Sequence, residues 1–265
     1  QSELPIYRQV FTNSYRLGCT LCPLFRNPYS AIRMQPDIYL GTLRISEPVI
    51  MLTGLGIALI CGYASLRLLR RQETAPAYRW MIRFFALMTV SSVLGPFLGH
   101  AFTYWAGFPG KYACWIFSIL SLGALSQAAI EHARSFFSML SYRGLTLLNL
   151  LGMSAAVTVA GLTKSFISVE AHSALAVLGF MLPLEGLVYA RRRDPGSHLF
   201  LQALPIAVFS LVPVVLKWSP GIWFTHLDVG HVLLYPYFVL LMLGAERMQH
   251  CSGTANIASS YFPPG

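Results

Sequence analysis

Seven apolar runs alternate with short polar connections along most of the chain. A run of about 20 apolar residues is long enough to cross a bilayer as an α-helix. The pattern therefore predicts seven transmembrane helices, near residues 49–69, 84–105, 113–130, 145–162, 171–190, 199–216 and 229–245. Short connections without an internal repeat favour an all-α membrane protein, a single bundle of seven transmembrane helices.

The pattern divides the chain into three parts. Residues 1–44 form a polar N-terminal extension, residues 45–247 the seven-helix membrane domain, and residues 248–265 an irregular C-terminal tail. The motif "ISEP" predicts the start of the first helix, with Ser46 as the cap, Glu47 at the positive end of the helix and Pro48 in the first turn. Five prolines fall inside the predicted spans and predict kinks, namely Pro96, Pro183, Pro205, Pro213 and Pro236.

Composition supports the membrane interpretation. The chain is 55% hydrophobic and only 11% charged, whereas a soluble domain carries about a quarter charged residues. The net charge of +9 comes from basic residues between the apolar runs, which is typical of membrane loops. We expect no binding to nucleic acid, because no basic face is free of the membrane.

The basic residues also predict an orientation. Arginines fill every second connection, as Arg70, Arg71, Arg79, Arg83, Arg134, Arg143, Arg191, Arg192 and Arg193. The alternate connections hold only Lys111, Lys164 and Lys217. This bias predicts an N-terminus outside and a C-terminus on the cytoplasm-like or matrix-like side. The extension carries further arginines on the opposite side, which a partner bound to it would tolerate.

Five cysteines are too few and too scattered for a disulfide framework. Cys61 and Cys114 lie in apolar runs and are predicted to behave as small hydrophobic residues. The lone pair Cys19 and Cys22, in "GCTLCP", leaves a zinc site, a disulfide and two free thiols as alternatives. The first residue, Gln1, fits removal of a targeting segment, and a shortened chain would look the same.

Five ionisable side chains are predicted at one membrane face, at the outer ends of spans two, five and seven. They are His100, His172, His226, Asp228 and His231. Ionisable groups inside spans are costly and indicate a functional site. His100, His226 and His231 are candidate zinc ligands, with Asp228 as a fourth group and a candidate base. The alternative is interfacial histidines hydrogen-bonded to neighbouring helices or to lipid headgroups.

Other ionisable side chains are predicted at the opposite face. Glu131, His132 and Arg134 end the third span, and Glu185 lies near the inner end of the fifth. Pairing of Glu185 with an arginine, or snorkelling to the interface, is the ordinary explanation. A proton relay is the alternative.

Three segments together resemble a known family. "SEPVIMLTG", "LGPFLGHAF" and "HLDVGHVLL", opening or lying in spans one, two and seven, are similar to the ceramidase-like seven-transmembrane hydrolase superfamily, which includes alkaline ceramidases and adiponectin–progestin receptor-like proteins. The resemblance implies a zinc ion between His100 on the second span and His231 on the seventh, and hydrolysis of lipid amides. Leu227 and Pro96 stand where the family has a histidine and a serine, so the resemblance describes a divergent member.

Two functions remain open. The first is a non-catalytic accessory subunit of a larger membrane complex, such as a respiratory-chain complex, on a degenerate ceramidase-like scaffold. Its partners would be lipid and other membrane subunits touching the N-terminal extension and the C-terminal tail, because polar terminal segments are ordered only when tied down. The basic chain points to the mitochondrial inner membrane. The alternative is a zinc-dependent membrane amidase that hydrolyses ceramide-like lipids, with Asp228 as the catalytic base.

Overall fold

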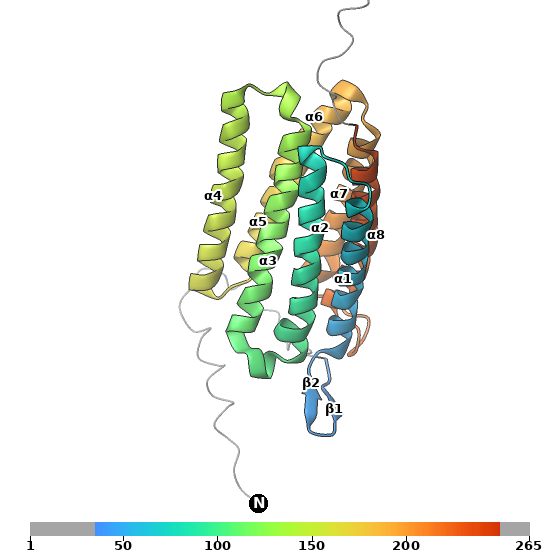
Figure 1. Cartoon of the computed structure of the whole chain (residues 1–265). Coiled ribbons are helices and arrows are strands. Elements are labelled where there is room, and N and C mark those ends of the chain that lie inside the picture. The colour runs from blue at the N-terminus through green and yellow to red at the C-terminus, as the bar shows by residue number, and fades with distance from the viewer. Residues whose placement is uncertain (1–34, 250–265) are drawn as a thin grey trace, which may run out of the picture. The chain divides into compact units, whose positions relative to one another are not determined.

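A computed structural model describes residues 35–249 of the chain (Figure 1). The elements that cross the bundle are, in order, α1 (Pro48–Leu69), α2 (Pro76–Leu94) with η2 (Gly95–Ala101), α3 (Thr103–His132), α4 (Met139–Thr163), α5 (Ile167–Ala174) with η4 (Leu175–Met181) and α6 (Leu182–Arg192), α7 (Pro195–Val215) and α8 (His226–Arg247). A short 3-10 helix, η3 (Arg134–Phe136), connects α3 to α4, and two strands, β1 (Ile38–Leu40) and β2 (Leu43–Ile45), precede α1.

Seven helical segments within residues 35–249 are long and apolar enough to cross a membrane. They correspond to the seven predicted spans, and the shortest has 21 residues, or about 32 Å at 1.5 Å per residue. This length matches a hydrocarbon core of about 30 Å. The predicted all-α bundle of seven transmembrane helices is confirmed, and the chain is an integral membrane protein.

The helices alternate in direction and pack mainly on their sequence neighbours, and α8 closes the bundle against α1 and α7. Helix α4 packs on α3 and α5 and stands at the edge of the bundle (Figure 1). The core is rich in aromatic rings; Phe84 stacks with Phe238 at 6.3 Å and contacts Phe85 at 4.8 Å. Cys61 and Cys114 are buried free thiols in this interior, as predicted.

Two of the seven spans contain a π-helical segment, η2 and η4. Pro96 lies in η2 and Pro183 follows η4, and a proline removes one backbone hydrogen-bond donor, which favours such local rewinding. Pro96 also packs closely against α1, because a Cβ placed on Gly54 would lie 2.6 Å from its Cγ atom. Sequence analysis predicted kinks at these prolines. In the structure, the helix next to each of them is distorted into a π-helical segment.

The start of α1 differs from the prediction. The N-cap is Glu47 and not Ser46, and within residues 35–249 neither side chain accepts a hydrogen bond from the first turn. The part of the predicted extension that the structure describes is an antiparallel hairpin of β1 and β2, which sequence analysis missed. Its three-residue strands are too short to show an alternating pattern. The other predictions for the N-terminal extension and the C-terminal tail concern residues 1–34 and 250–265, which lie outside the described residues.

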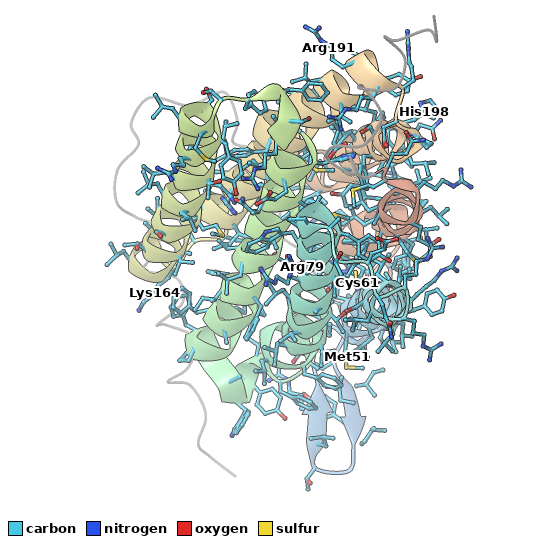
Figure 2. All side chains as sticks on the ribbon, turned by 45° about the horizontal axis from the view of Figure 1, so that its top comes forward. Met51, Cys61, Arg79, Lys164, Arg191 and His198 are labelled. Carbon is cyan, nitrogen blue, oxygen red and sulfur yellow. The ribbon has the colours of Figure 1, made fainter. Side chains whose placement is uncertain are left out.

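The alternating directions give the bundle two distinct ends. At the arginine end, α1, α3, α6 and α8 finish and α2, α4 and α7 begin; at the histidine end, α1, α3, α5 and α8 begin and η2, α4 and α7 finish. Figure 2 shows Arg191 and His198 together at the arginine end and Lys164 at the foot of α4, which belongs to the histidine end. Arginine is thus concentrated at one end, as the sequence predicts.

The closest helix contact at the arginine end joins α7 to α8 and yields a first prediction. A Cβ added to Gly196 would lie 2.6 Å from the carbonyl oxygen of Gly244 and 2.8 Å from the amide nitrogen of Met248. We expect Gly196→Ala to lower the free energy of unfolding in detergent by about 1–3 kcal/mol, because backbone atoms must move apart. Gly186→Ala is the matched control, since a Cβ there meets no described atom within 4 Å. Equal thermal stability of the two variants would contradict the close contact.

Candidate functional site

The predicted site residues lie at the histidine end, and the structure brings only some of them together. His100 is carried by η2, and Asp228 and His231 by the first turns of α8. The prediction that these side chains share one end of the bundle is therefore confirmed for α8 and η2.

Asp228 is fully buried and is surrounded by hydrogen-bond donors. Its Oδ2 atom accepts from the backbone N–H of Thr225 at 2.6 Å, from the Thr225 hydroxyl at 2.8 Å and from Nε2 of Gln35 at 2.5 Å. Its Oδ1 atom accepts from the hydroxyl of Thr53 at 3.2 Å. Thr225 and Asp228 together form a capping box at the start of α8. The carboxylate is thus used to start a helix and to join it to α1.

Gln35 is a functional residue of this arrangement that sequence analysis missed. Its side-chain oxygen accepts from the backbone N–H groups of Val49 and Ile50, at 3.1 and 3.3 Å, while its amide nitrogen donates to Asp228. One buried amide therefore caps α1 and connects it to α8. The residue lies in the polar extension, outside the spans, so no periodic pattern indicates its position.

Thr53 on α1 connects Asp228 to His231. Its hydroxyl lies 3.2 Å from Oδ1 of Asp228 and 3.1 Å from Nδ1 of His231. A hydroxyl has one proton, so when Thr53 donates to the carboxylate it accepts from the N–H at Nδ1 of His231. In that tautomer the Nε2 atom of His231 carries the lone pair, which is the form that binds a metal or a proton.

Glu47 and His100 form the other pair at this end. The carboxylate lies 2.7 Å from Nδ1 of His100, and the two side chains are 22% and 28% exposed. Glu47 has φ 47° and ψ 53°, a left-handed conformation that costs a residue with a side chain about 1–3 kcal/mol. His100 lies in a π-helical segment, and both features concentrate at functional sites. The pair is partly accessible, in contrast to Asp228.

His226 and His172 do not join this group. Nδ1 of His226 lies 3.4 Å from the hydroxyl of Ser219, which also accepts the backbone N–H of His226 at 3.1 Å. His172 is buried against α3 and α4 near Gly152, and neither of its ring nitrogens has a hydrogen-bond partner among residues 35–249. The contacts of His226 and His172 therefore do not support His226 as a ligand shared with His100 and His231.

No group of three or more histidine, cysteine or carboxylate side chains within residues 35–249 is placed to hold a metal ion. His100 bonds to Glu47 and His231 to Thr53, Asp228 is saturated by hydrogen bonds, and His226 bonds to Ser219. The described residues therefore do not assemble the predicted zinc ligands as a preformed set.

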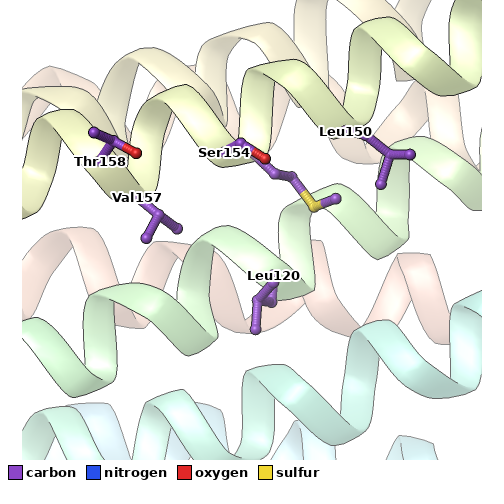
Figure 3. Close-up of a pocket in the computed structure, with 6 residues that line it drawn as sticks. Leu120, Leu150, Ser154, Val157 and Thr158 are labelled. Atoms are coloured by element: carbon purple, nitrogen blue, oxygen red, sulfur yellow. The ribbon is translucent and has the colours of Figure 1, made fainter.

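Two surface cavities of the described bundle lie away from these side chains. A groove of about 330 Å³ between α3 and α4 is lined by Leu120, Leu150, Met153, Ser154, Val157 and Thr158. Figure 3 shows Leu120 on α3 and Leu150, Ser154, Val157 and Thr158 on the neighbouring α4. A second cavity, of about 220 Å³, lies between the hairpin and the start of α3, beside Trp105. Neither cavity is lined by a candidate site residue.

A second buried polar cluster lies at the arginine end. Nδ1 of His132 lies 3.0 Å from Oε2 of Glu185, which also accepts from the hydroxyl of Ser197 at 2.6 Å. Asp194, the N-cap of α7, accepts from the backbone N–H groups of Ser197 and Gln249, and its Oδ2 atom lies 4.0 Å from Nε2 of His132. The predicted pairing of Glu185 with an arginine is therefore wrong; its partner is the imidazole of a histidine from α3.

Cys19 and Cys22 lie outside the described residues, as does Cys251. Residues 49–250 match a family described as a family of unknown function, DUF6962, and the chain belongs to this family. The matched residues run from the first turn of α1 to just beyond α8, so the family corresponds to the seven-helix bundle. No curated protein matches the chain, and no solved structure matches it.

The hydrogen bonds of Asp228 yield a second prediction. We expect Asp228→Asn to lower the free energy of unfolding in detergent by about 2–4 kcal/mol. The side-chain amide of asparagine cannot accept hydrogen bonds from all four donors, and the charge-assisted hydrogen bonds of the carboxylate are lost. Glu170→Gln is the matched control, since Glu170 is an exposed acidic residue near the start of α5, at the same end. Thermal unfolding at one detergent concentration measures both; equal loss in the two variants would contradict the anchoring role.

Proposed function

We propose that this member of the DUF6962 family is a non-catalytic accessory subunit of a larger membrane complex, built on a degenerate ceramidase-like scaffold. The observation that supports this proposal most directly is the environment of Asp228. The carboxylate that would act as base is fully buried and holds four hydrogen bonds within the chain. A general base must instead reach the proton that it abstracts from a substrate or a water molecule.

The other polar groups at the histidine end support the same function. Thr53 ties His231 to the Asp228 carboxylate, and Gln35 ties the first turn of α1 to α8. These bonds join helices that are far apart in sequence, and in a membrane interior such interhelical hydrogen bonds contribute about 0.6–2 kcal/mol each. The cluster therefore stabilises the bundle.

The parent complex and the organelle are further parts of the proposal. A chain with net charge +9 and arginines in alternate connections suits an energised inner membrane, and we propose the mitochondrial inner membrane and a respiratory-chain assembly. The partner subunits would contact the N-terminal extension, residues 1–44, and the C-terminal tail, residues 248–265. The arginine end then faces the matrix and the histidine end faces the opposite side.

A zinc-dependent lipid amidase is the second candidate, and the Glu47–His100 pair favours it. This pair is partly exposed, it lies at the same end of the bundle as His231, and it rests on a strained backbone and a π-helical segment. A zinc ion would supply an activated water for amide hydrolysis. Within residues 35–249, two imidazoles take the place of a full set of zinc ligands.

Metal content and assembly state distinguish the two candidates. We expect elemental analysis of the purified full chain to find far less than one zinc per chain. We also expect native mass spectrometry after mild solubilisation to find other membrane subunits bound. One zinc per chain that is lost in His100→Ala and in His231→Ala, and retained in His198→Ala, would establish the second candidate. His198 is an exposed histidine of the arginine end and is the matched control. A zinc-free chain that is monomeric in its native membrane would contradict the subunit role.

A further inference from the structure

Charge is distributed very unevenly between the two ends of the described bundle. The arginine end carries eleven arginines, no lysine and five acidic residues within residues 35–249. The histidine end carries one arginine, three lysines and four acidic residues. One end is therefore strongly basic through guanidinium groups alone, and the other is balanced.

Two acidic residues of the arginine end are buried in the interior, and a third pairs with arginines. Glu246 pairs with Arg67 and Arg71, of which the second lies at 3.3 Å. Glu185 and Asp194 are buried around His132. Glu246 therefore offsets part of the charge of Arg67 and Arg71, whereas the charges of Glu185 and Asp194 face the interior and do not offset the surface arginines.

Three consecutive arginines, Arg191, Arg192 and Arg193, end α6 and begin the turn to α7. Arg192 crosses to the neighbouring turn, where Nη2 donates to the hydroxyl of Ser135 and the guanidinium lies 4.5 Å from the centre of the Phe136 ring. This contact brings the turn after α6 beside the turn after α3. We call Arg134, Arg191, Arg192 and Arg193 the arginine seam.

Aromatic rings contact three of the four guanidinium groups of the seam. Arg134 lies over Tyr142 at 4.8 Å and Arg193 over Tyr189 at 5.3 Å, in addition to Arg192 over Phe136. Stacking uses the face of a guanidinium and leaves its N–H edges available, and these edges match the oxygens of a phosphate. The three consecutive arginines form no ion pair with an acidic side chain of residues 35–249.

Exposed apolar side chains lie directly beside the seam. Met139 and Leu140, in the first turn of α4, are 53% and 82% exposed, and the lipid-facing surface of α4 continues from them. A soluble phosphate ion would make no favourable contact with these apolar side chains. A phospholipid would, because its acyl chains lie next to its headgroup phosphate, on the side of the membrane interior. Figure 2 shows Arg191 projecting from the end of α6.

We propose that the arginine seam binds the headgroup phosphate of anionic phospholipids in the leaflet that borders the arginine end. Its N–H edges hold the phosphate oxygens and the exposed start of α4 contacts the acyl chains. Arginine at every basic position of this end fits such a site, because its planar fork binds phosphate at two points and lysine does not.

Native mass spectrometry of the delipidated full chain, titrated with cardiolipin or with phosphatidylcholine, tests the proposal. We expect the chain to retain cardiolipin far more strongly. We expect the triple variant Arg191→Gln, Arg192→Gln, Arg193→Gln to bind it about fivefold more weakly per arginine removed, or on the order of a hundredfold in total. The triple variant Arg70→Gln, Arg79→Gln, Arg83→Gln removes the same charge from the same end and should stay within a few fold of the unchanged chain. Thermal unfolding confirms that both variants fold.

Three results would overturn the proposal. Equal weakening in the two triple variants would show a diffuse attraction to the whole basic surface. Equal retention of cardiolipin and phosphatidylcholine would show that headgroup charge is not recognised. Displacement of cardiolipin by millimolar inorganic phosphate would show a site for soluble phosphate. By contrast, Arg192→Lys should weaken retention, because it keeps the charge and removes the fork and the stacking on Phe136.

Discussion

A carboxylate that is buried at the first turn of a membrane helix must be surrounded by hydrogen-bond donors, and this requirement organises the histidine end. Asp228 takes its donors from the residue that caps its own helix, from α1 through Thr53, and from Gln35 before α1. An unsatisfied carboxylate in this position would cost several kcal/mol. The starts of α1 and α8 are therefore held at the same level, and His231 meets Thr53 as a consequence.

The seven spans could be predicted because the bilayer leaves few alternatives. A chain in hydrocarbon must satisfy its own backbone groups, so a long apolar run between charged connections becomes a helix. The start of α1 could not be predicted in the same way. Ser46 has the right chemistry for a cap, but the bonds to the first turn come from Gln35, and Glu47 takes a left-handed conformation directed to His100. Local sequence does not report a cap supplied from outside the helix.

Sequence analysis placed the candidate site residues at the correct end of the bundle, but it did not predict which side chains they contact. His100 bonds to Glu47 and Glu185 to His132, and each pair is separated by 53 residues in sequence. Such contacts depend on the rotation of each helix about its axis. In a soluble protein an amphipathic pattern specifies this rotation, but here both lipid-facing and core-facing positions are apolar, so the pattern leaves it open. His226 was misplaced for this reason, because only the folded loop brings it to Ser219.

The two ends of the bundle use the same residue types to opposite effect. At the histidine end, carboxylates, hydroxyls and imidazoles bond mainly to one another, and the surface that remains is electrically balanced. At the arginine end, Glu185 and Asp194 are withdrawn into the interior by His132, and Glu246 is held by Arg67. Burial of the acids, as much as the number of arginines, therefore produces the basic surface. A surface made in this way keeps its charge whatever the function of the histidine end, and anionic headgroups are the counter-charge that a membrane supplies beside it.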